Sequence, residues 1–463
     1  MAAPFKAIPT VDPSLGNGRP ALDEISAKTT QDGFYEPHPA IIDPELSAMN
    51  LPIPGEDQPI ATNPNLPPSK GYILPMLYFD MGPNNLFRLL RQGAVTAYQM
   101  GRTIAVPVFH RHPRMGDAAK NPFVLPIFDT NYTVDLVWPA DDTIDTKALS
   151  EKVHVIDMAH FQNQCNNKLD AIVKCGQVDP KREDGLIHFS RAAAMPADKT
   201  IQITNFNELM LPDGTPGSLD VSAYPCMGIV YGKKCLPDQV GWLNSFKEIS
   251  QNYLRPKTMR TLADKFIERK MSGSPYLAVH WRYESDWLDM CKETRPKGAR
   301  ERNGAICRLV MGLSYDQNIR TVFINNIKSK MTAYGLQSVY LASPPNNIEL
   351  IRLLNNAFPG NFFFMDDIVR FANETMWPGF LSNNYVASFV EQEVCFKSKF
   401  YMGAPLSSWT QSVLVDRLAR DNEDHESALD VVTAGSPPPP PPGYPPLIFQ
   451  FPEGDFAFNF KKG

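Results

Sequence analysis

The sequence predicts an α/β protein with two Rossmann-like domains facing a cleft. Short apolar runs, typical of strands buried in a parallel sheet, alternate with segments of helical periodicity. This alternation occurs twice, once within residues 72–109 and again from about residue 274 to residue 420. In both series polar and charged residues directly follow apolar runs. Open α/β sheets bind their ligands at such strand ends.

Length and composition are those of a globular protein with several cores. The chain has 463 residues, 43% of them hydrophobic and 21% charged, which predicts about two or three domains. The formal net charge of -5 gives no reason to expect a nucleic acid partner. No apolar run approaches the roughly 20 residues needed to span a bilayer. We therefore expect neither nucleic acid binding nor a membrane span.

Proline marks the two ends of the chain. Residues 1–68 are rich in proline and lack periodicity, which predicts an extended arm or linker. Residues 431–463 form a second proline-rich segment, in which the run Pro437–Pro442 favours polyproline II. This tail is either a solvated end or a ligand for SH3 or WW domains. Between the ends we expect one domain over residues 69–250 and another over residues 251–430.

The first domain opens with an apolar run over Tyr72–Phe79, which predicts a strand. A polar turn follows it, and a helix begins near Leu86 and stops at Gly101. The apolar run Arg102–Phe109 predicts the next strand and completes a βαβ unit. Its first loop then points toward a ligand. Residues 120–245 are richer in loops and yield no clear motif.

The second domain begins with the apolar run Tyr276–Val279. Further strands are predicted over residues 338–343, 361–365 and 399–402, with helices over residues 347–357, 384–395 and from about 408 to 420. His280 and Arg282 directly follow the first of these strands. The planar fork of an arginine suits a diphosphate, because it donates two parallel hydrogen bonds and keeps its charge.

His-x-Arg alone is weak, since His112 and Arg114 repeat the spacing. The alternative for Arg282 is a structural ion pair with Asp286. Ser407 and Ser408 raise a similar choice, because helix caps and phosphate sites use the same hydroxyl and N–H groups. Trp409 beside them is either a stacking face or part of the core.

The usual signatures of metal and Walker-type nucleotide sites are missing from the sequence. Seven cysteines are scattered without the spacing of zinc ligands, and no Asp-x-Asp triplet offers a metal clamp for a sugar nucleotide. The stretch Gly228–Lys234 lacks the spacing of a Walker A loop. We therefore expect no metal and no resident cofactor.

Three segments in order resemble the GDP-fucose protein O-fucosyltransferase family. The stretch Gly82–Arg88 is similar to the family's glycine-rich first loop, which carries an asparagine and enters a helix. His280–Trp287, with Cys291 after it, is similar to the His-x-Arg motif of the branch that modifies EGF-like repeats. The stretch from Glu391 to Trp409 is similar to the third motif. The resemblance spans about residues 70–420.

The resemblance implies a GT-B fold with the nucleotide sugar held mainly by the C-terminal domain. It implies metal-independent, inverting transfer of fucose from GDP-fucose to a Ser or Thr hydroxyl of a folded repeat, EGF-like or thrombospondin-type. Arg282 and Asn85 are the expected catalytic residues. The residues expected to bind GDP-fucose share strand ends and helix starts: Gly82, Asn84, His280, Arg282, Asp286, Ser343, Ser407, Ser408 and Trp409.

Two departures from the family pattern keep other functions open. Ser343 stands where the family commonly has a base-binding aspartate, and the first loop holds no carboxylate base, with Asp80 the nearest. One alternative is a GT-B glycosyltransferase with another donor or a glycan acceptor. Another is a relative that binds a nucleotide sugar or a glycoprotein without turnover. The resemblance implies the endoplasmic reticulum or another secretory lumen, although residues 1–20 lack the apolar core of a signal peptide.

Overall fold

The computed structural model contains two parallel sheets, which confirms the predicted α/β class. It describes residues 63–77, 83–107, 109–110, 137–138, 143–178, 195–211, 215–232, 235, 240–282, 313, 317–343, 348–375, 381, 384–404, 407–420 and 425–427. Most of the predicted arm and the whole proline-rich tail lie outside these residues. Two predicted site residues, Gly82 and Asp286, also lie outside them.

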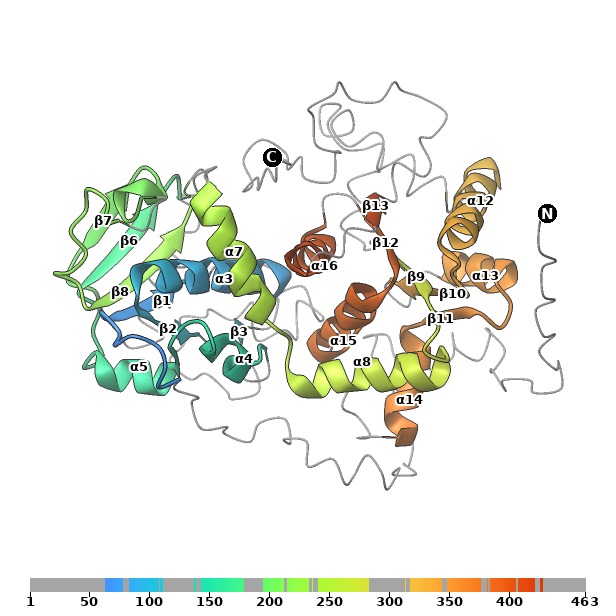
Figure 1. Ribbon diagram of the computed structural model, residues 1–463, viewed down its shortest axis with the longest axis horizontal. Coiled ribbons are helices and arrows are strands. Elements are labelled where there is room, and N and C mark those ends of the chain that lie inside the picture. The colour runs from blue at the N-terminus through green and yellow to red at the C-terminus, as the bar shows by residue number, and fades with distance from the viewer. Residues whose placement is uncertain are drawn as a thin grey trace, which may run out of the picture.

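The first sheet has six strands in the order β5-β2-β1-β8-β6-β7 (Figure 1). All its pairings are parallel. In chain order the strands are β1 (Tyr72–Pro75), β2 (Thr103–Val106), β5 (Val155–Asp157), β6 (Ala171–Cys175), β7 (Thr200–Ile203) and β8 (Cys226–Tyr231). Strands β1 and β2 confirm two predicted runs, although β1 ends earlier than predicted. The sequence interpretation of residues 120–245 as richer in loops missed strands β5, β6, β7 and β8, which come from this segment.

Helix α3 (Pro83–Met100) joins β1 to β2, as the βαβ pattern predicts. It begins a few residues before the predicted start at Leu86. Proline suits the first helical position, where the missing N–H would have no partner. The helix ends at Met100 because Gly101 adopts φ of 63°, a left-handed conformation that costs glycine little.

Shorter elements complete the first half of the chain. A separate antiparallel pair joins β3 (Phe109–His110) to β4 (Val137–Trp138). The remaining helices are α4 (Thr146–Ser150), α5 (Met158–Gln164), the 3₁₀ helix η3 (Phe206–Glu208) and α7 (Val240–Asn252). The predicted domain boundary at 250/251 falls near the end of α7, and the boundary itself stays a prediction.

The second sheet has five parallel strands in the order β11-β10-β9-β12-β13. They are β9 (Tyr276–His280), β10 (Ser338–Ala342), β11 (Phe362–Phe364), β12 (Phe400–Gly403) and β13 (His425–Ser427). Numbered from β9, this order is 3-2-1-4-5, the order of a Rossmann sheet. The predicted strands in this half are confirmed to within one or two residues.

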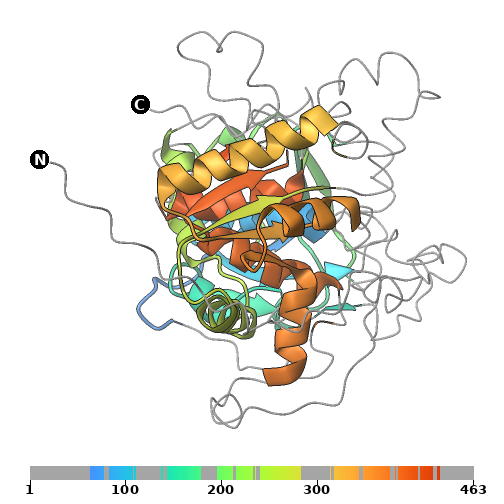
Figure 2. The same cartoon turned by 90° about the vertical axis from the view of Figure 1, so that its right-hand side faces the viewer.

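Both faces of the second sheet are covered by helices, so its strands are apolar on both sides. Leu277 and Val279 face a core cluster with α12 (Gln317–Tyr334) and α13 (Ile348–Ala357). Tyr276 and Ala278, alternating with them, join the other cluster, which includes α8 (Lys257–Lys270), α14 (Met365–Thr375) and α15 (Asn384–Lys397). Figure 2 shows α12 lying across the sheet. A last helix, α16 (Ser408–Ala419), contacts α3, α7 and α15 and thereby joins the two halves.

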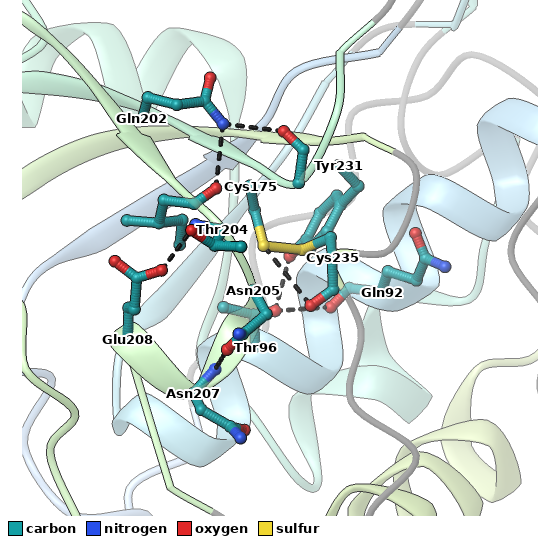
Figure 3. The surroundings of a disulfide bond; sticks show 12 residues. Gln92, Thr96, Cys175, Gln202, Thr204, Asn205, Asn207, Glu208, Tyr231 and Cys235 are labelled. Carbon is teal, nitrogen blue, oxygen red and sulfur yellow. Dashed lines mark hydrogen bonds between the residues drawn. A yellow bond between two sulfur atoms is a disulfide. The ribbon is translucent and has the colours of Figure 1, made fainter.

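Two disulfides cross-link segments of the first sheet. Cys165 after α5 pairs with Cys226 at the start of β8, and Cys175 at the end of β6 pairs with Cys235 after β8. Figure 3 shows the second bond beside Tyr231, whose hydroxyl lies 2.6 Å from Thr96 Oγ1 of α3. Both bonds close loops of about 60 residues.

Removing the first disulfide is expected to destabilise the protein. The double variant Cys165→Ala, Cys226→Ala should lose about 2–4 kcal/mol of unfolding free energy, because the long loop regains entropy when the chain unfolds. Urea denaturation of the wild type and the variant, both without reductant, measures the difference. Equal midpoints with equal slopes would show that this bond does not form in the folded protein.

Candidate functional site

The predicted site residues of the second sheet lie at the carboxyl ends of three adjacent strands. In the register of the sheet His280 pairs with Ala342, and Val279 pairs with Met402. The ends of β9, β10 and β12 therefore meet at one edge. The strand order reverses between β9 and β12, and doubly wound sheets bind ligands at such a switch point.

His280, the last residue of β9, is buried against the first turn of α16. Its imidazole stacks on the indole of Trp409, with ring centroids 4.0 Å apart and an interplanar angle of 22°. The indole is itself held in place, because Nε1 donates to Ser388 Oγ of α15 at 2.8 Å. One face of Trp409 is thus used by His280, so this side chain orients the histidine as well as packing against the core.

Thr410 is the hydrogen-bond partner of His280 Nδ1. Thr410 Oγ1 lies 2.6 Å from His280 Nδ1, and it also accepts a long hydrogen bond of 3.4 Å from the hydroxyl of Tyr401. The Thr410 hydroxyl can donate to Nδ1 or accept from it, so either ring nitrogen can carry the proton of the neutral imidazole. Burial lowers the pKa of His280 and keeps the ring uncharged near neutral pH.

Gly403 lets α16 approach the sheet closely enough for this contact. A Cβ at this position would lie 2.4 Å from Thr410 Cγ2, a distance that no pair of carbons tolerates. The glycine at the end of β12 is therefore required for the hydrogen bond between Thr410 and His280.

Acidification is expected to destabilise the protein through His280. Burial, and secondarily the charge of Arg282, lowers the pKa of this imidazole from 6.5 to about 3. The unfolded chain takes up the proton near pH 6.5 and the folded chain only near pH 3, so stability falls as the pH drops through that window. In urea denaturation at about pH 7 and pH 5, the wild type should lose more stability than His280→Gln. Equal losses in both proteins would contradict the low pKa.

Arg282 lies just beyond β9, next to His280. Its side chain is half-buried, and the chain beside it is tied to the sheet because Trp281 N donates to Ala342 O at 2.8 Å. Ser343, the residue after β10, is buried at the same edge. The charge of Arg282 adds to burial in lowering the pKa of His280.

The first turn of α16 has no side-chain cap. Ser407 occupies the N-cap position, as the sequence suggests, but its side chain makes no capping hydrogen bond. Ser408 is the first helical residue, and its carbonyl oxygen accepts from Ser412 Oγ at 3.1 Å. An uncapped helix start offers N–H groups and a partial positive charge, which favour an anion.

Asn84 and Asn85 lie on the first turn of α3, at the carboxyl end of β1. The first sheet also reverses its strand order here, between β1 and β8. Asn84 Oδ1 accepts a hydrogen bond from Gln392 Nε2 of α15. The structure therefore joins this turn to the helix layer of the second sheet.

The sequence interpretation missed Thr410 as a partner of His280 and Gln392 as a partner of Asn84. Gln392 lies within a segment that resembles the family's third motif, so its position was flagged, but its contact was not. Thr410 follows the Ser-Ser-Trp triplet without any signal of its own. Among the residues that the structure describes, no group of three or more metal-ligating side chains gathers.

The family follows from the sequence as a whole. The chain matches the profile described as "GDP-fucose protein O-fucosyltransferase" over residues 76–419. This chain belongs to that family. The match to the GDP-fucose protein O-fucosyltransferase profile runs from the residue after β1 to the end of α16 and includes most strands of both parallel sheets.

Solved structures give more distant similarities. POFUT1 in complex with GDP-fucose aligns at 15% identity with a TM-score of 0.47, over 77% of this chain and 96% of that chain. NodZ, a fucosyltransferase from Bradyrhizobium, aligns at 14% identity with a TM-score of 0.36, over 74% of this chain and 91% of that chain. Comparison with curated protein sequences finds no match.

Proposed function

We propose that this protein transfers fucose from GDP-fucose to a Ser or Thr hydroxyl of a folded protein repeat. Membership of the GDP-fucose protein O-fucosyltransferase family supports the donor. One observation carries the proposal for the site: His280, Arg282 and the uncapped start of α16 flank the switch point of a Rossmann sheet.

Three groups on the donor side bind different parts of the nucleotide. Arg282 binds the diphosphate, and its fixed charge stabilises the negative charge that develops on the departing GDP. The Nε2 atom of His280 forms a hydrogen bond with the nucleotide. Ser407, Ser408 and the N–H groups of the first turn of α16 bind phosphate oxygens.

The reaction replaces one bond at the anomeric carbon of fucose. The acceptor hydroxyl oxygen forms its bond to this carbon from the face opposite GDP, the bond to the diphosphate oxygen breaks, and the configuration inverts. The proton of the hydroxyl is taken up by water or by a phosphate oxygen of the departing GDP, because an asparagine side chain cannot act as a base. Asn85 positions the acceptor hydroxyl, while Gly82 and Asn84 stay proposed contacts of GDP-fucose. Positioning of this kind is worth several kcal/mol of the barrier. No step needs a metal, because Arg282 supplies the positive charge.

A second candidate is a glycosyltransferase of the same architecture with another donor or a glycan acceptor. Ser343 favours it, since a buried serine stands at the base-binding strand end where the family commonly has aspartate. A hydroxyl both donates and accepts, whereas a carboxylate accepts the two hydrogen bonds that guanine offers. Asp286 remains a proposed donor contact or a partner of Arg282.

We also place the protein in an oxidising compartment such as the lumen of the endoplasmic reticulum. The disulfides Cys165–Cys226 and Cys175–Cys235 support this, because such bonds persist outside the reducing cytosol. Within the described residues no helix is long and apolar enough to cross a membrane.

Calorimetric titration with GDP, UDP and GDP-fucose in EDTA tests the donor and the absence of a metal together. Selective binding of GDP and GDP-fucose is expected. Incubation with GDP-fucose and folded EGF-like or thrombospondin-type repeats, followed by mass spectrometry, then tests transfer. Preference for UDP would favour the second candidate, and GDP binding without transfer to any protein or glycan would favour a binding protein.

A further inference from the structure

The side chain of Asn84 is fixed by a hydrogen bond from a residue in the other half of the chain. Gln392, fully buried on α15, donates from Nε2 to Asn84 Oδ1 on the first turn of α3. The two residues are 308 positions apart in the sequence. This bond joins the strand-end turn of the first sheet to a helix that covers the second sheet.

Arg255 sets the direction of the Gln392 amide. Its Nε and Nη2 atoms donate to Gln392 Oε1 at 3.1 and 2.7 Å. A guanidinium has no acceptor and keeps its charge, so the amide oxygen has to face Arg255. The amide nitrogen then faces Asn84, which in turn has to present its oxygen. The amide nitrogen of Asn84 is thereby turned away from Gln392.

Arg255 is fixed by a buried group of four residues, which we call the central charge cluster: Arg91, Arg255, Glu393 and Asp416. Arg255 Nη1 lies 3.0 Å from Glu393 Oε1 and 2.8 Å from Asp416 Oδ2. Arg91 Nη2 of α3 lies 2.6 Å from Asp416 Oδ1. Because these side chains are at most 4% exposed, neither solvent nor rotamer freedom loosens the guanidinium of Arg255.

We propose that Gln392, oriented by Arg255, is a positioning residue that fixes the acceptor-side turn of α3 relative to the donor site. This rests on the proposed function, in which Asn85 positions the acceptor hydroxyl. Within the described residues the side-chain hydrogen bonds of Gln392 go to Arg255 and Asn84, not to His280, Arg282 or the first turn of α16. Loss of Gln392 should therefore disturb transfer while the affinity for GDP stays the same.

Hydrogen exchange of the purified protein, followed by mass spectrometry of peptides that cover residues 83–90, tests the positioning without any acceptor. Gln392→Met keeps the side-chain length and removes both polar atoms. It should raise exchange in this segment about five- to tenfold, because α3 loses the hydrogen bond that Gln392 donates to Asn84. Asn84→Ala loses the same hydrogen bond and should raise exchange there by a similar factor, and the double variant should add nothing to the effect of Gln392→Met.

The control is Gln251→Met. Gln251 Nε2 donates to Ala419 O at 2.9 Å, so this side-chain hydrogen bond joins α7 to α16 and does not involve α3. This variant should leave exchange of residues 83–90 unchanged. It separates the loss of one particular glutamine contact from a general loosening between the two halves.

The functional measurement compares donor affinity with transfer. GDP binding by Gln392→Met should stay within about twofold of the wild type, and transfer to the folded repeat should fall at least fivefold. Unchanged exchange at residues 83–90, or additive effects of the two single variants, would overturn the inference. Absence of GDP binding in the wild type would instead refute the proposed function.

Discussion

Replacing Arg282 with alanine is expected to reduce the rate of fucose transfer by a factor of about 10²–10³. In the proposed reaction Arg282 stabilises the charge on the departing diphosphate. Its place at the end of β9, beside the reversal of strand order, puts it where a Rossmann sheet binds nucleotides. Steady-state transfer kinetics and GDP calorimetry on the wild type and Arg282→Ala measure the effect.

Two further variants decide what the arginine contributes. Arg282→Lys keeps the charge but loses the paired donors, so it should recover only part of the activity. Arg352→Ala removes an exposed arginine of α13 that lies 3.5 Å from Glu349, and should have little effect. Transfer by Arg282→Ala at the wild-type rate would show that the charge of the leaving group is stabilised elsewhere.

The strand-end residues could be predicted because their signal is local. An apolar run such as Tyr276–Val279 followed directly by His280 and Arg282 indicates both a buried strand and its polar end. The same reasoning located β10 and β12, and with them Ser343 and Ser407. Gly101 predicted the end of α3 correctly, since its left-handed conformation is a property of one residue.

The middle of the first sheet could not be predicted because the alternation of strand and helix is interrupted there. In the part of the β7–β8 connection that the structure describes, the only helix is η3, which is too short for helical periodicity. Strand β8 is a continuous apolar run, and such a run alone cannot be told from a buried helical segment. Only its pairing with β1 and β6 identifies it as a strand. Local sequence does not indicate which strands pair with each other.

Contacts between residues far apart in the sequence could not be predicted for the same reason. Arg91 and Asp416 are 325 positions apart, and nothing in the sequence near either residue indicates the other. In isolation each is an ordinary helical residue expected at the surface. Their burial depends on how α3, α7 and α16 meet, which only the assembled fold determines.

Asp416 lies at the centre of this assembly. Burial alone would raise the pKa of its carboxyl, but the charges of Arg91, Arg255 and Arg420 outweigh burial and hold the pKa below its ordinary value. The carboxylate is therefore charged in the folded protein. It also lies on α16, whose first turn holds Ser407, Ser408 and Trp409, so one side chain supports both the joint between the sheets and the donor site.

Asp416→Asn is expected to destabilise the folded protein by about 3–5 kcal/mol. The variant removes the negative charge of Asp416 and leaves the buried charges of Arg91 and Arg255 only partly neutralised. Urea denaturation at neutral pH measures the loss. The matched control is Asp264→Asn on α8, which removes the half-exposed partner of Lys397 and should cost at most about 1 kcal/mol. If both variants lost the same small amount, the central charge cluster would not be what holds the two sheets together. Stability would then rest on the apolar contacts among α3, α7 and α16.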